Sequence, residues 1–414
     1  MRILNVTETY APFLEFGGPP VKVRALSEGL AHRGHSVNVL TADWGLEKRL
    51  GSRPDADLLA LGWDRSPFGW RHNENGVQSI YIPSWFRYRA VSWNPAAKRY
   101  LRARLQNFDL VHIFGLYDLL GPAAASAARE RKIPYVVEPI GMFVPIVRNV
   151  LLKRMYHSLI GRRLLAGSSA VIATSQQEVE ELAAAGVTRE KIVVRRNGVE
   201  MPPSWPFRGK FRASLGIPSH AKLILFLGRL SLKKSPELLL QAFAQLPANI
   251  AENNLMLAFA GPDEGGLQQR LASEASRLGV SARVKFSGPI FGEDKWAAYR
   301  DADVFVLPSR NENFGNTAAE SVAAGTPVVV TEQCGIAPHL KDIAGLVVPH
   351  DAASLSNALA RLLSDSQLHS RLVAGCAEVT SRLDWEEPVA EMESLYERLT
   401  NAKQISTVPS RPGE

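Results

Sequence analysis

The feature that most constrains this chain is an alternation of short apolar runs with segments of helical periodicity, which occurs twice along the sequence. The first series ends at a turn-rich passage, Asn197–Gly198 followed by three prolines between Met201 and Pro206, a composition typical of a linker. The pattern restarts with the apolar run Leu223–Leu227, as expected for a strand buried on both faces. Alternating strands and helices form parallel sheets covered by helices, so the sequence predicts two doubly wound α/β domains.

The predicted domains are residues 1–200 and 201–385, with a helix over 386–400 that returns to the first domain and a flexible polar tail over 403–414. A helix is predicted over Val21–Arg33, closed by Gly34. Strands are predicted at Arg2–Thr7, Ser36–Ala42, Leu110–Phe114, Tyr135–Glu138, Ala170–Thr174 and Ile192–Arg195, and then at Leu223–Leu227, Leu255–Ala260, Val284–Ser287, Val304–Leu307, Pro327–Thr331 and Gly345–Val348. Ligands of such sheets lie at the carboxyl ends of the strands, so two sheets facing each other would form one deep cleft.

Composition excludes several classes of protein. The two cysteines, Cys334 and Cys376, cannot form a disulfide framework, and no zinc spacing is present. No apolar run reaches the length of a membrane span, and the N-terminal run is too short for a signal peptide, so we expect a cytoplasmic protein. The net charge of +7 is concentrated between Trp85 and Leu165, which hold 14 Lys/Arg and 4 Asp/Glu. Such an excess suits nucleic acid, anionic lipid or an acidic substrate, or is simply a solvated helical surface.

The segment Pro308–Pro327 (PSRNENFGNTAAESVAAGTP) gives the strongest local signal. It follows a predicted strand, and Thr317 and Glu320 match a capping box at the start of a short helix. The N-terminus of that helix would offer free N–H groups to a phosphate, and Gly315 would allow a close approach of the backbone. Alternatively, Glu320 only completes the helix cap.

A second signal is Gly228-Arg229-Leu-Ser-Leu-Lys-Lys234-Ser235-Pro236-Glu237, which follows the strand Leu223–Leu227. Ser235 and Pro236 predict a helix start. Arg229 and Lys234 would therefore lie at a strand's carboxyl end, where two cations can neutralise a diphosphate. The alternative is a solvated basic loop.

The third signal is Gly17–Gly18 between the first strand and the first helix. Two glycines there would let a phosphate or a sugar lie against the backbone. The GxGxxG spacing of a dinucleotide site is absent, so this signal is weak by itself.

Together these segments resemble glycosyltransferase family 4, the retaining group 1 transferases with the GT-B fold, in which two Rossmann-like domains face each other across a cleft. The family's two glutamates separated by seven residues match Glu312 and Glu320, and Phe314 and Gly315 lie between them. Further matches are NGV at Asn197, AGPDEGG at Ala260, VKFSG at Val284, DADVFVLPS at Asp301, GLVVP at Gly345 and the late Trp385.

The resemblance implies a role for each matching residue. Glu320 would hold the donor ribose, and Glu312 would lie near the transferred sugar. Arg229, Lys234 and Glu312 are the implied catalytic residues. The other implied donor-binding residues are Gly17, Gly18, Gly228, Gly261, Phe314, Gly315, Asn316 and Thr317. Three positions depart from the family pattern: Phe114 and Ile140 stand where it commonly has histidines, and Ser235 where it has glycine. His112 is therefore either a substrate contact or a buried structural histidine.

The implied function is retaining, metal-independent transfer of a sugar from a nucleoside-diphosphate sugar to a glycan or lipid-linked acceptor, in polysaccharide or glycoconjugate biosynthesis. No cofactor and no metal are expected, because Arg229, Lys234 and a helix N-terminus can replace Mg²⁺ at the diphosphate. Asp301-x-Asp303 leads into a strand, and Asp55-x-Asp57 lies in a polar stretch read as irregular. The alternatives are a sugar-nucleotide epimerase or phosphorylase of the same fold, a nicotinamide enzyme and a basic nucleic-acid-binding protein. We expect no nucleic-acid partner.

The segment Asn149–Leu165 mixes Lys/Arg with Leu, Ile and Met, as helices at a membrane interface do. It predicts peripheral contact with an anionic membrane. The alternative is a basic helix packed in the first domain.

Overall fold

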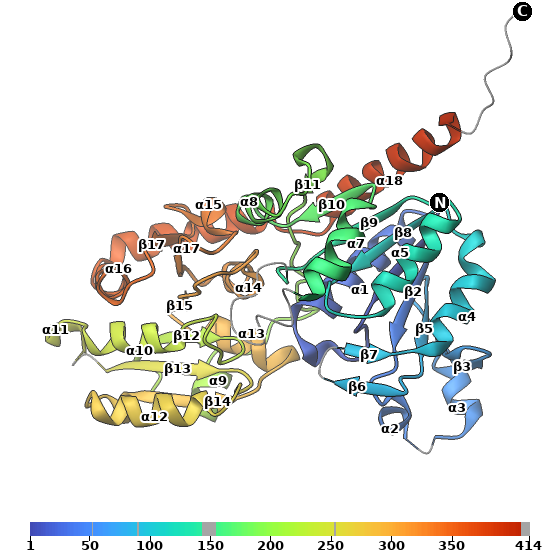
Figure 1. Cartoon of the computed structure of the whole chain (residues 1–414). Coiled ribbons are helices and arrows are strands. Elements are labelled where there is room, and N and C mark those ends of the chain that lie inside the picture. The colour runs from blue at the N-terminus through green and yellow to red at the C-terminus, as the bar shows by residue number, and fades with distance from the viewer. Residues whose placement is uncertain (52, 89–90, 143–154, 252–253, 407–414) are drawn as a thin grey trace, which may run out of the picture. The chain divides into compact units, whose positions relative to one another are not determined.

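The computed structural model describes residues 1–51, 53–88, 91–142, 155–251 and 254–406 (Figure 1). The chain forms two compact units. Unit 1 contains Met1–Gly198 together with Trp385–Glu414, and unit 2 contains Val199–Asp384. No helix among the described residues is both long enough and apolar enough to cross a membrane.

Unit 1 is built on a nine-stranded sheet with the order β11-β10-β9-β8-β1-β2-β5-β4-β3. All neighbouring strands are parallel except β4, which is antiparallel to both β3 and β5. The strands are β1 (Arg2–Thr7), β2 (Ser36–Ala42), β3 (Trp63–Ser66), β4 (Gly69–Glu74), β5 (Val77–Ile82), β8 (Leu110–Phe114), β9 (Tyr135–Glu138), β10 (Ala170–Ala173) and β11 (Ile192–Val194). A separate hairpin is formed by β6 (Phe86–Tyr88) and β7 (Val91–Trp93).

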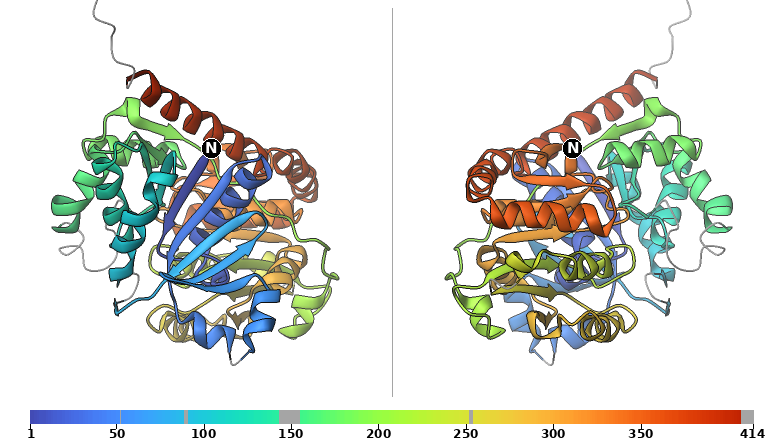
Figure 2. Two further views of the ribbon diagram at one scale, coloured as in Figure 1. Left: turned by 90° about the vertical axis from the view of Figure 1, so that its right-hand side faces the viewer. Right: turned by 90° about the vertical axis from the view of Figure 1, so that its left-hand side faces the viewer.

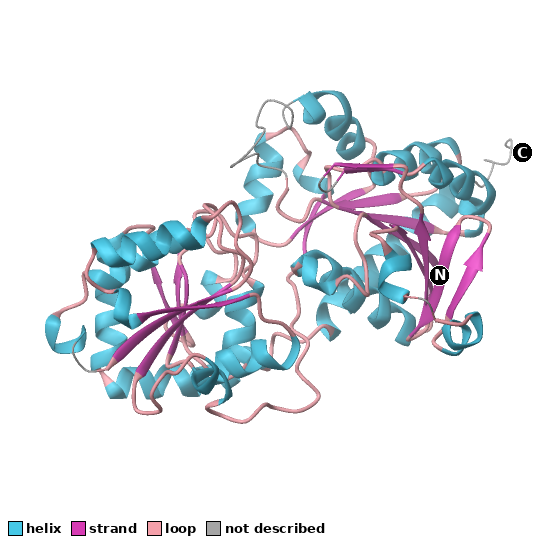
Figure 3. Ribbon diagram, turned by 90° about the horizontal axis from the view of Figure 1, so that it is seen from below, coloured by secondary structure: helices cyan, strands magenta, loops and turns pink. Residues whose placement is uncertain are grey.

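The helices of unit 1 pack on this sheet, as the views in Figures 2 and 3 show. They are α1 (Gly18–His32), α2 (Leu46–Leu50), α3 (Asp55–Ala60), α4 (Pro95–Arg104), α5 (Leu120–Glu130), α7 (Arg162–Ala166), α8 (Gln176–Ala184) and α18 (Glu386–Ser406). Shorter turns are η1 (Leu14–Phe16), η2 (Leu105–Asn107), η4 (Arg189–Lys191) and the π-helix η3 (His157–Gly161).

The C-terminal helix α18 packs against α1. Val389 lies so close to Gly29 that a Cβ there would come within 2.6 Å of Val389 Cγ2. On the same helix, Glu393 accepts a hydrogen bond of 2.7 Å from Arg33, and Met392 is buried in the core of the unit. These contacts explain why the end of the chain belongs to the same unit as its beginning.

Unit 2 has a six-stranded, all-parallel sheet with the order β14-β13-β12-β15-β16-β17. The strands are β12 (Lys222–Leu227), β13 (Leu255–Ala260), β14 (Val284–Gly288), β15 (Val304–Leu307), β16 (Val328–Thr331) and β17 (Gly345–Val348). The helices are α9 (Lys210–Ser214), α10 (Pro236–Ala244), α11 (Ala248–Ala251), α12 (Leu267–Arg277), α13 (Gly292–Asp301), α14 (Asn316–Ala323), α15 (Ala337–Leu340), α16 (Ala352–Ser364) and α17 (Ser366–Thr380), with the turn η5 (Ser281–Arg283).

Strand β12 shows how the unit 2 sheet is buried on both faces. Leu223 and Leu225 join the hydrophobic core on one face, whereas Ile224 and Phe226 join the core on the other. Side chains of a strand alternate between faces, so a continuous apolar run serves two cores.

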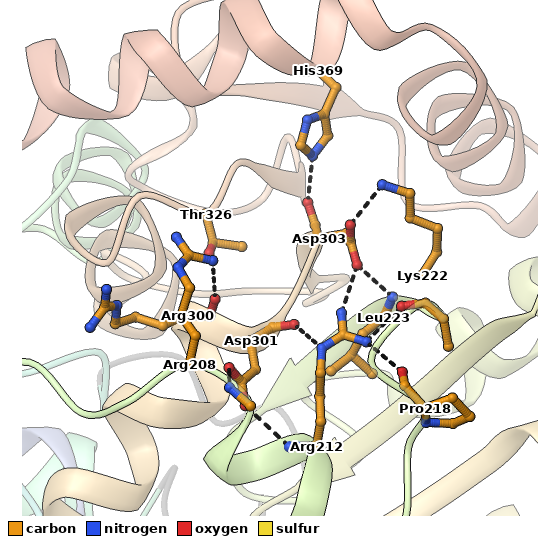
Figure 4. A network of polar contacts seen from close by, with 12 residues as sticks. Arg208, Arg212, Pro218, Lys222, Leu223, Arg300, Asp301, Asp303, Thr326 and His369 are labelled. Atoms are coloured by element: carbon orange, nitrogen blue, oxygen red, sulfur yellow. Dashed lines mark hydrogen bonds and ion pairs between the residues drawn. The ribbon is translucent and has the colours of Figure 1, made fainter.

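Asp301 and Asp303 form a polar network at the amino end of β15 (Figure 4). Asp301 accepts hydrogen bonds from the backbone amides of Phe211 and Arg212, at 2.9 and 3.1 Å. Asp303 accepts from Lys222 Nζ at 2.9 Å and from the Arg212 guanidinium at 2.9 Å. Both carboxylates are thus occupied in fastening α9 to the sheet, at the opposite end of the strand from a ligand site.

Some sequence-based expectations were wrong in detail. Asp55 and Asp57 lie in the first turn of the helix α3, and not in an irregular stretch. Helix α18 continues to Ser406, so the residues expected to begin the tail are helical, and 407–414 lie outside the described residues. The strands β3, β4 and β5 and the hairpin β6–β7 were not predicted.

Candidate active site

The candidate site in unit 2 lies at the point where the order of the sheet reverses. From β12 the chain moves one way to β13 and β14, and later the other way from β15 to β16 and β17. Open parallel sheets bind their ligands at the carboxyl ends of strands at such a switch point. The loop after β12 carries Arg229 and Lys234, and the loop after β15 carries Glu312 and Gly315.

Lys234 and Glu312 form an ion pair across this switch point. Lys234 Nζ lies 2.9 Å from Glu312 Oε2, and their side chains are 21% and 19% exposed. Burial disfavours the charged form of Glu312, but attraction to Lys234 and to Lys233 outweighs it and lowers the pKa of this carboxyl group. Glu312 is therefore an anion at neutral pH, held beside a cation that a ligand phosphate could reach.

The backbone of Glu312 is fixed by the loop that follows β16. Its amide donates to the carbonyl of Gln333 at 2.9 Å, and its carbonyl accepts from the amide of Gly335 at 2.8 Å. Both backbone polar groups of Glu312 are therefore hydrogen-bonded, although the residue lies in a loop.

Two glycines let the loops after β12 and β13 approach closely. A Cβ on Gly261 would lie 2.0 Å from the carbonyl oxygen of Gly228, and the φ of Gly261 is +134°. Gly228 has a φ of +153°, and a Cβ there would lie 3.3 Å from Lys234 Cδ. Only glycine fits both positions, and the space left by Gly228 is where the Lys234 side chain runs.

Arg229 is more loosely held. Its side chain is mostly exposed, and its Nη1 atom lies 4.0 Å from Glu264 Oε2. An exposed pair at this distance contributes little to stability, so the guanidinium is available to a ligand.

The helix α14 begins at Asn316 with Gly315 at its N-cap, so the predicted capping box is wrong. Gly315 has a φ of +106° and, as a glycine, brings no side chain to the N-cap. The buried Oγ1 atom of Thr317 has no hydrogen-bond partner among the described residues. The N-terminus of α14 follows the carboxyl end of β15, where its partial positive charge can attract an anion.

Glu320 does not reach back to the cap, because α13 holds its carboxylate. Lys295 Nζ donates to one oxygen at 2.7 Å, and Tyr299 Oη donates to the other at 2.9 Å. Lys295 is a residue that the sequence analysis missed, and nothing in the local sequence links it to Glu320. The Phe314 side chain is buried in the core of unit 2, so it fixes the loop between Glu312 and Gly315 and does not face a ligand.

In unit 1, Gly17 and Gly18 lie at the carboxyl end of β1, which is beside β8 at the switch point of that sheet. Gly17 has a φ of +101°, and no atom lies within 4 Å of the position that a Cβ would take. The loop is open at this point and its conformation requires glycine.

His112 is completely buried, and its surroundings favour the structural interpretation. Its Nδ1 atom lies 2.6 Å from the hydroxyl of Tyr396 on α18. Burial lowers the pKa of His112 to about 3, so the ring is neutral. His112 Nε2 also lies 3.7 Å from Glu138, a buried carboxylate that accepts hydrogen bonds of 2.7 Å from Lys22 and from Arg195.

Two family models match the chain, one in each unit. The model for glycosyl transferases group 1 matches residues 207–376, and the model for the glycosyl transferase 4-like domain matches residues 17–198. The D-inositol 3-phosphate glycosyltransferase of Xylanimonas cellulosilytica is 29% identical over 404 residues, which are 94% of this chain and 93% of that protein. The D-inositol 3-phosphate glycosyltransferase 1 of Catenulispora acidiphila is 31% identical over 309 residues, 70% of this chain and 72% of that protein.

Among solved structures, Anabaena HepE in complex with UDP and glucose has a TM-score of 0.72 and 20% identity, over 96% of this chain and 100% of that chain. At this identity the likeness shows the fold alone. Its agreement with the two parallel-sheet units described above confirms the predicted fold class. The chain belongs to the group 1 glycosyltransferases of the family 4 type and has the GT-B fold.

Proposed function

We propose that this glycosyltransferase takes its sugar from a nucleoside-diphosphate sugar and transfers it with retention of configuration, without a metal ion. The observation that carries the proposal is the grouping at the switch point of unit 2, where Lys234 pairs with Glu312 in the loop that leads into the N-terminus of α14. Arg229 adds a second, exposed cation on the same loop as Lys234.

The charges suit a diphosphate leaving group. As the bond between sugar and phosphate breaks, negative charge grows on the departing oxygen. Arg229, Lys234 and the N–H groups of α14 would stabilise that charge in the transition state more than in the ground state. Unit 2 would therefore bind the donor, and unit 1, with the open loop at Gly17, would bind the acceptor.

The carboxylates would have separate tasks. Glu320, held by Lys295 and Tyr299, would accept hydrogen bonds from the ribose hydroxyls, since an oriented carboxylate can accept two at once. Glu312, which is ionised, would lie beside the transferred sugar. Gly228 and Gly261 would let the donor approach the backbone.

In the proposed reaction, the acceptor hydroxyl attacks the anomeric carbon from the face that the diphosphate leaves. The bond between the anomeric carbon and the phosphate oxygen breaks, and a glycosidic bond forms between that carbon and the acceptor oxygen. The acceptor proton passes to the departing phosphate oxygen. The products are a nucleoside diphosphate and a glycoside with the same anomeric configuration as the donor, and no covalent enzyme intermediate forms.

Calorimetric titration with UDP, GDP, ADP and NAD in EDTA tests the donor site. UDP comes first because HepE was solved with UDP and glucose. Saturable binding of one nucleoside diphosphate, weakened by Arg229→Ala and by Glu320→Ala, supports the proposal, whereas binding of NAD alone contradicts it. Product formed only when an acceptor is present separates transfer from epimerisation.

The acceptor is proposed to be a glycan or a lipid-linked glycan at the cytoplasmic face of a membrane. The predicted interfacial segment Asn149–Leu165 lies partly outside the described residues. In its described part Met155 and Leu159 are exposed, whereas Leu164 and Leu165 are buried, so one face of this segment packs in the core and the other carries apolar side chains to the surface.

A further inference from the structure

The hairpin β6–β7 of unit 1 carries a cluster of exposed aromatic side chains. Trp85, Phe86 and Trp93 are 75%, 61% and 52% exposed. Phe86 and Trp93 are cross-strand partners, and the rings of Trp85 and Trp93 meet edge to face with centroids 5.8 Å apart. Apolar side chains of this size are usually buried, and three exposed on one small element mark an interaction surface.

The base of this hairpin is held rigidly by Asn94. The buried Asn94 amide donates to the carbonyl of Ile82 at 3.1 Å and to the Ser84 hydroxyl at 2.9 Å. Its side-chain oxygen accepts a hydrogen bond of 2.5 Å from the Ser92 hydroxyl. The hairpin is thus tied to the end of β5, a strand of the main sheet (Figure 1).

The sequence that runs from the hairpin into α4 is cationic and contains no acidic residue. From Ser84 to Phe108 the chain holds six Lys/Arg and no Asp/Glu. Helix α4 follows β7 directly, and it buries Ala97, Tyr100 and Leu101 while its Lys98, Arg102 and Arg104 are exposed. Within the part of the chain that the structure describes, these three cations form no ion pair.

We infer that Trp85, Phe86 and Trp93, with the exposed cations of α4, form a docking surface for an anionic lipid bilayer. Tryptophan and phenylalanine insert at the boundary between headgroups and acyl chains, and unpaired Lys/Arg are attracted to anionic headgroups. A glycan stacked on the tryptophans would account for the rings alone. It would leave the exposed lysine and arginine side chains of α4 unexplained, whereas an anionic bilayer explains both the aromatic rings and these cations.

The inference of a docking surface rests on the proposed function in one respect only: the surface would bring the enzyme to an acceptor held in the membrane. Vesicle binding is measured without donor or acceptor, so a negative result leaves the nucleotide site untouched. Conversely, a failure of nucleotide binding would leave the docking surface standing.

The test is flotation of the full chain with vesicles of phosphatidylglycerol and phosphatidylcholine, compared with phosphatidylcholine alone, at low and at high salt. We expect binding to the anionic vesicles at low salt and its loss at high salt, because salt screens exposed charges. Trp85→Ser/Phe86→Ser should lower the partition coefficient by at least about tenfold. Lys98→Gln and Arg102→Gln should each lower it by about fivefold.

Phe207→Ser is the matched control, because Phe207 is 86% exposed and lies in unit 2. It should bind vesicles like the wild type, and since all the substituted side chains are exposed, thermal melts should not change. Absence of binding at low salt would overturn the inference, as would wild-type binding by Trp85→Ser/Phe86→Ser. If that variant instead loses only its turnover of a soluble glycan acceptor, the rings form a sugar platform and the inference is wrong.

Discussion

Replacing Lys234 by Met removes the cation from the switch point of unit 2 while preserving much of the side chain's volume. The lost interaction with the donor is a charged hydrogen bond, worth about 1.5–3 kcal/mol. We therefore expect the dissociation constant for the nucleoside diphosphate to rise by about 10- to 150-fold. The loss in kcat/KM should be at least as large, because charge on the diphosphate grows in the transition state.

The same substitution should reverse the pH dependence that Glu312 gives to stability. In the wild type the pKa of Glu312 is lowered, so its contribution to stability is present above the unfolded pKa and is lost as pH falls through the folded pKa. Without Lys234, burial dominates and raises the pKa. The contribution is then present below the unfolded pKa and is lost as pH rises through the folded pKa.

Urea unfolding at a series of pH values measures this effect. At neutral pH, Lys234→Met should cost about 1–2 kcal/mol, less than for a fully buried pair because both side chains are partly exposed. Adding Glu312→Gln should recover most of this stability, since no unpaired carboxylate remains. It should not recover nucleotide binding.

The double variant Lys234→Met/Glu312→Gln separates a structural role of the pair from a ligand-binding one. A stable double variant that binds the nucleoside diphosphate like the wild type would refute the assignment of Lys234 to the diphosphate. A single variant whose stability shows the wild-type pH dependence would refute the reasoning about Glu312.

Three further predictions concern other sites. Glu320→Ala should weaken binding of nucleoside diphosphates by about tenfold or more in calorimetry but leave pyrophosphate binding unchanged, because only the ribose contact is lost. Gly261→Ala should destabilise unit 2 by about 2 kcal/mol or more in urea unfolding, because its Cβ would clash with the carbonyl of Gly228. In unit 1, attraction to Arg195 and Lys22 outweighs the effect of burial and lowers the pKa of Glu138 to about 2, so the stability it contributes should be lost as pH falls from about 4.5 towards 2. Glu138→Gln should cost about 3–5 kcal/mol at neutral pH and remove this acid dependence.

The sequence predicted the parallel strands other than β5, because continuous apolar runs such as Leu223–Leu227 have few other stable arrangements. It missed the hairpin β6–β7, whose Phe86 and Trp93 side chains are exposed and whose anchor, Asn94, bonds to residues about ten positions earlier in the chain. An exposed short hairpin carries no burial pattern, so periodicity cannot reveal it.

The structure brings Lys234 and Glu312 together at the switch point of unit 2, whereas the predicted capping box was wrong. The pairing of Lys234 with Glu312 follows from two loops at one switch point. The capping box failed because Gly315, with a φ of +106°, occupies the N-cap. The partners of Glu320 come from α13, more than twenty residues earlier, and only tertiary packing brings Lys295 and Tyr299 to it.

The packing of α18 on α1 has a consequence for synthesis on the ribosome. Unit 2 is inserted within unit 1, because the chain leaves unit 1 after Gly198 and re-enters it at Trp385. Two contacts of unit 1 can form only after the C-terminal helix has been translated. Val389 then packs against Gly29, and the hydroxyl of Tyr396 bonds to His112. Domains usually fold in the order in which they emerge. Unit 1 is therefore the first to be synthesised and the last to complete its fold. Until unit 2 has been translated, the apolar face of α1 lacks its partner helix and has to be protected from contact with other nascent chains.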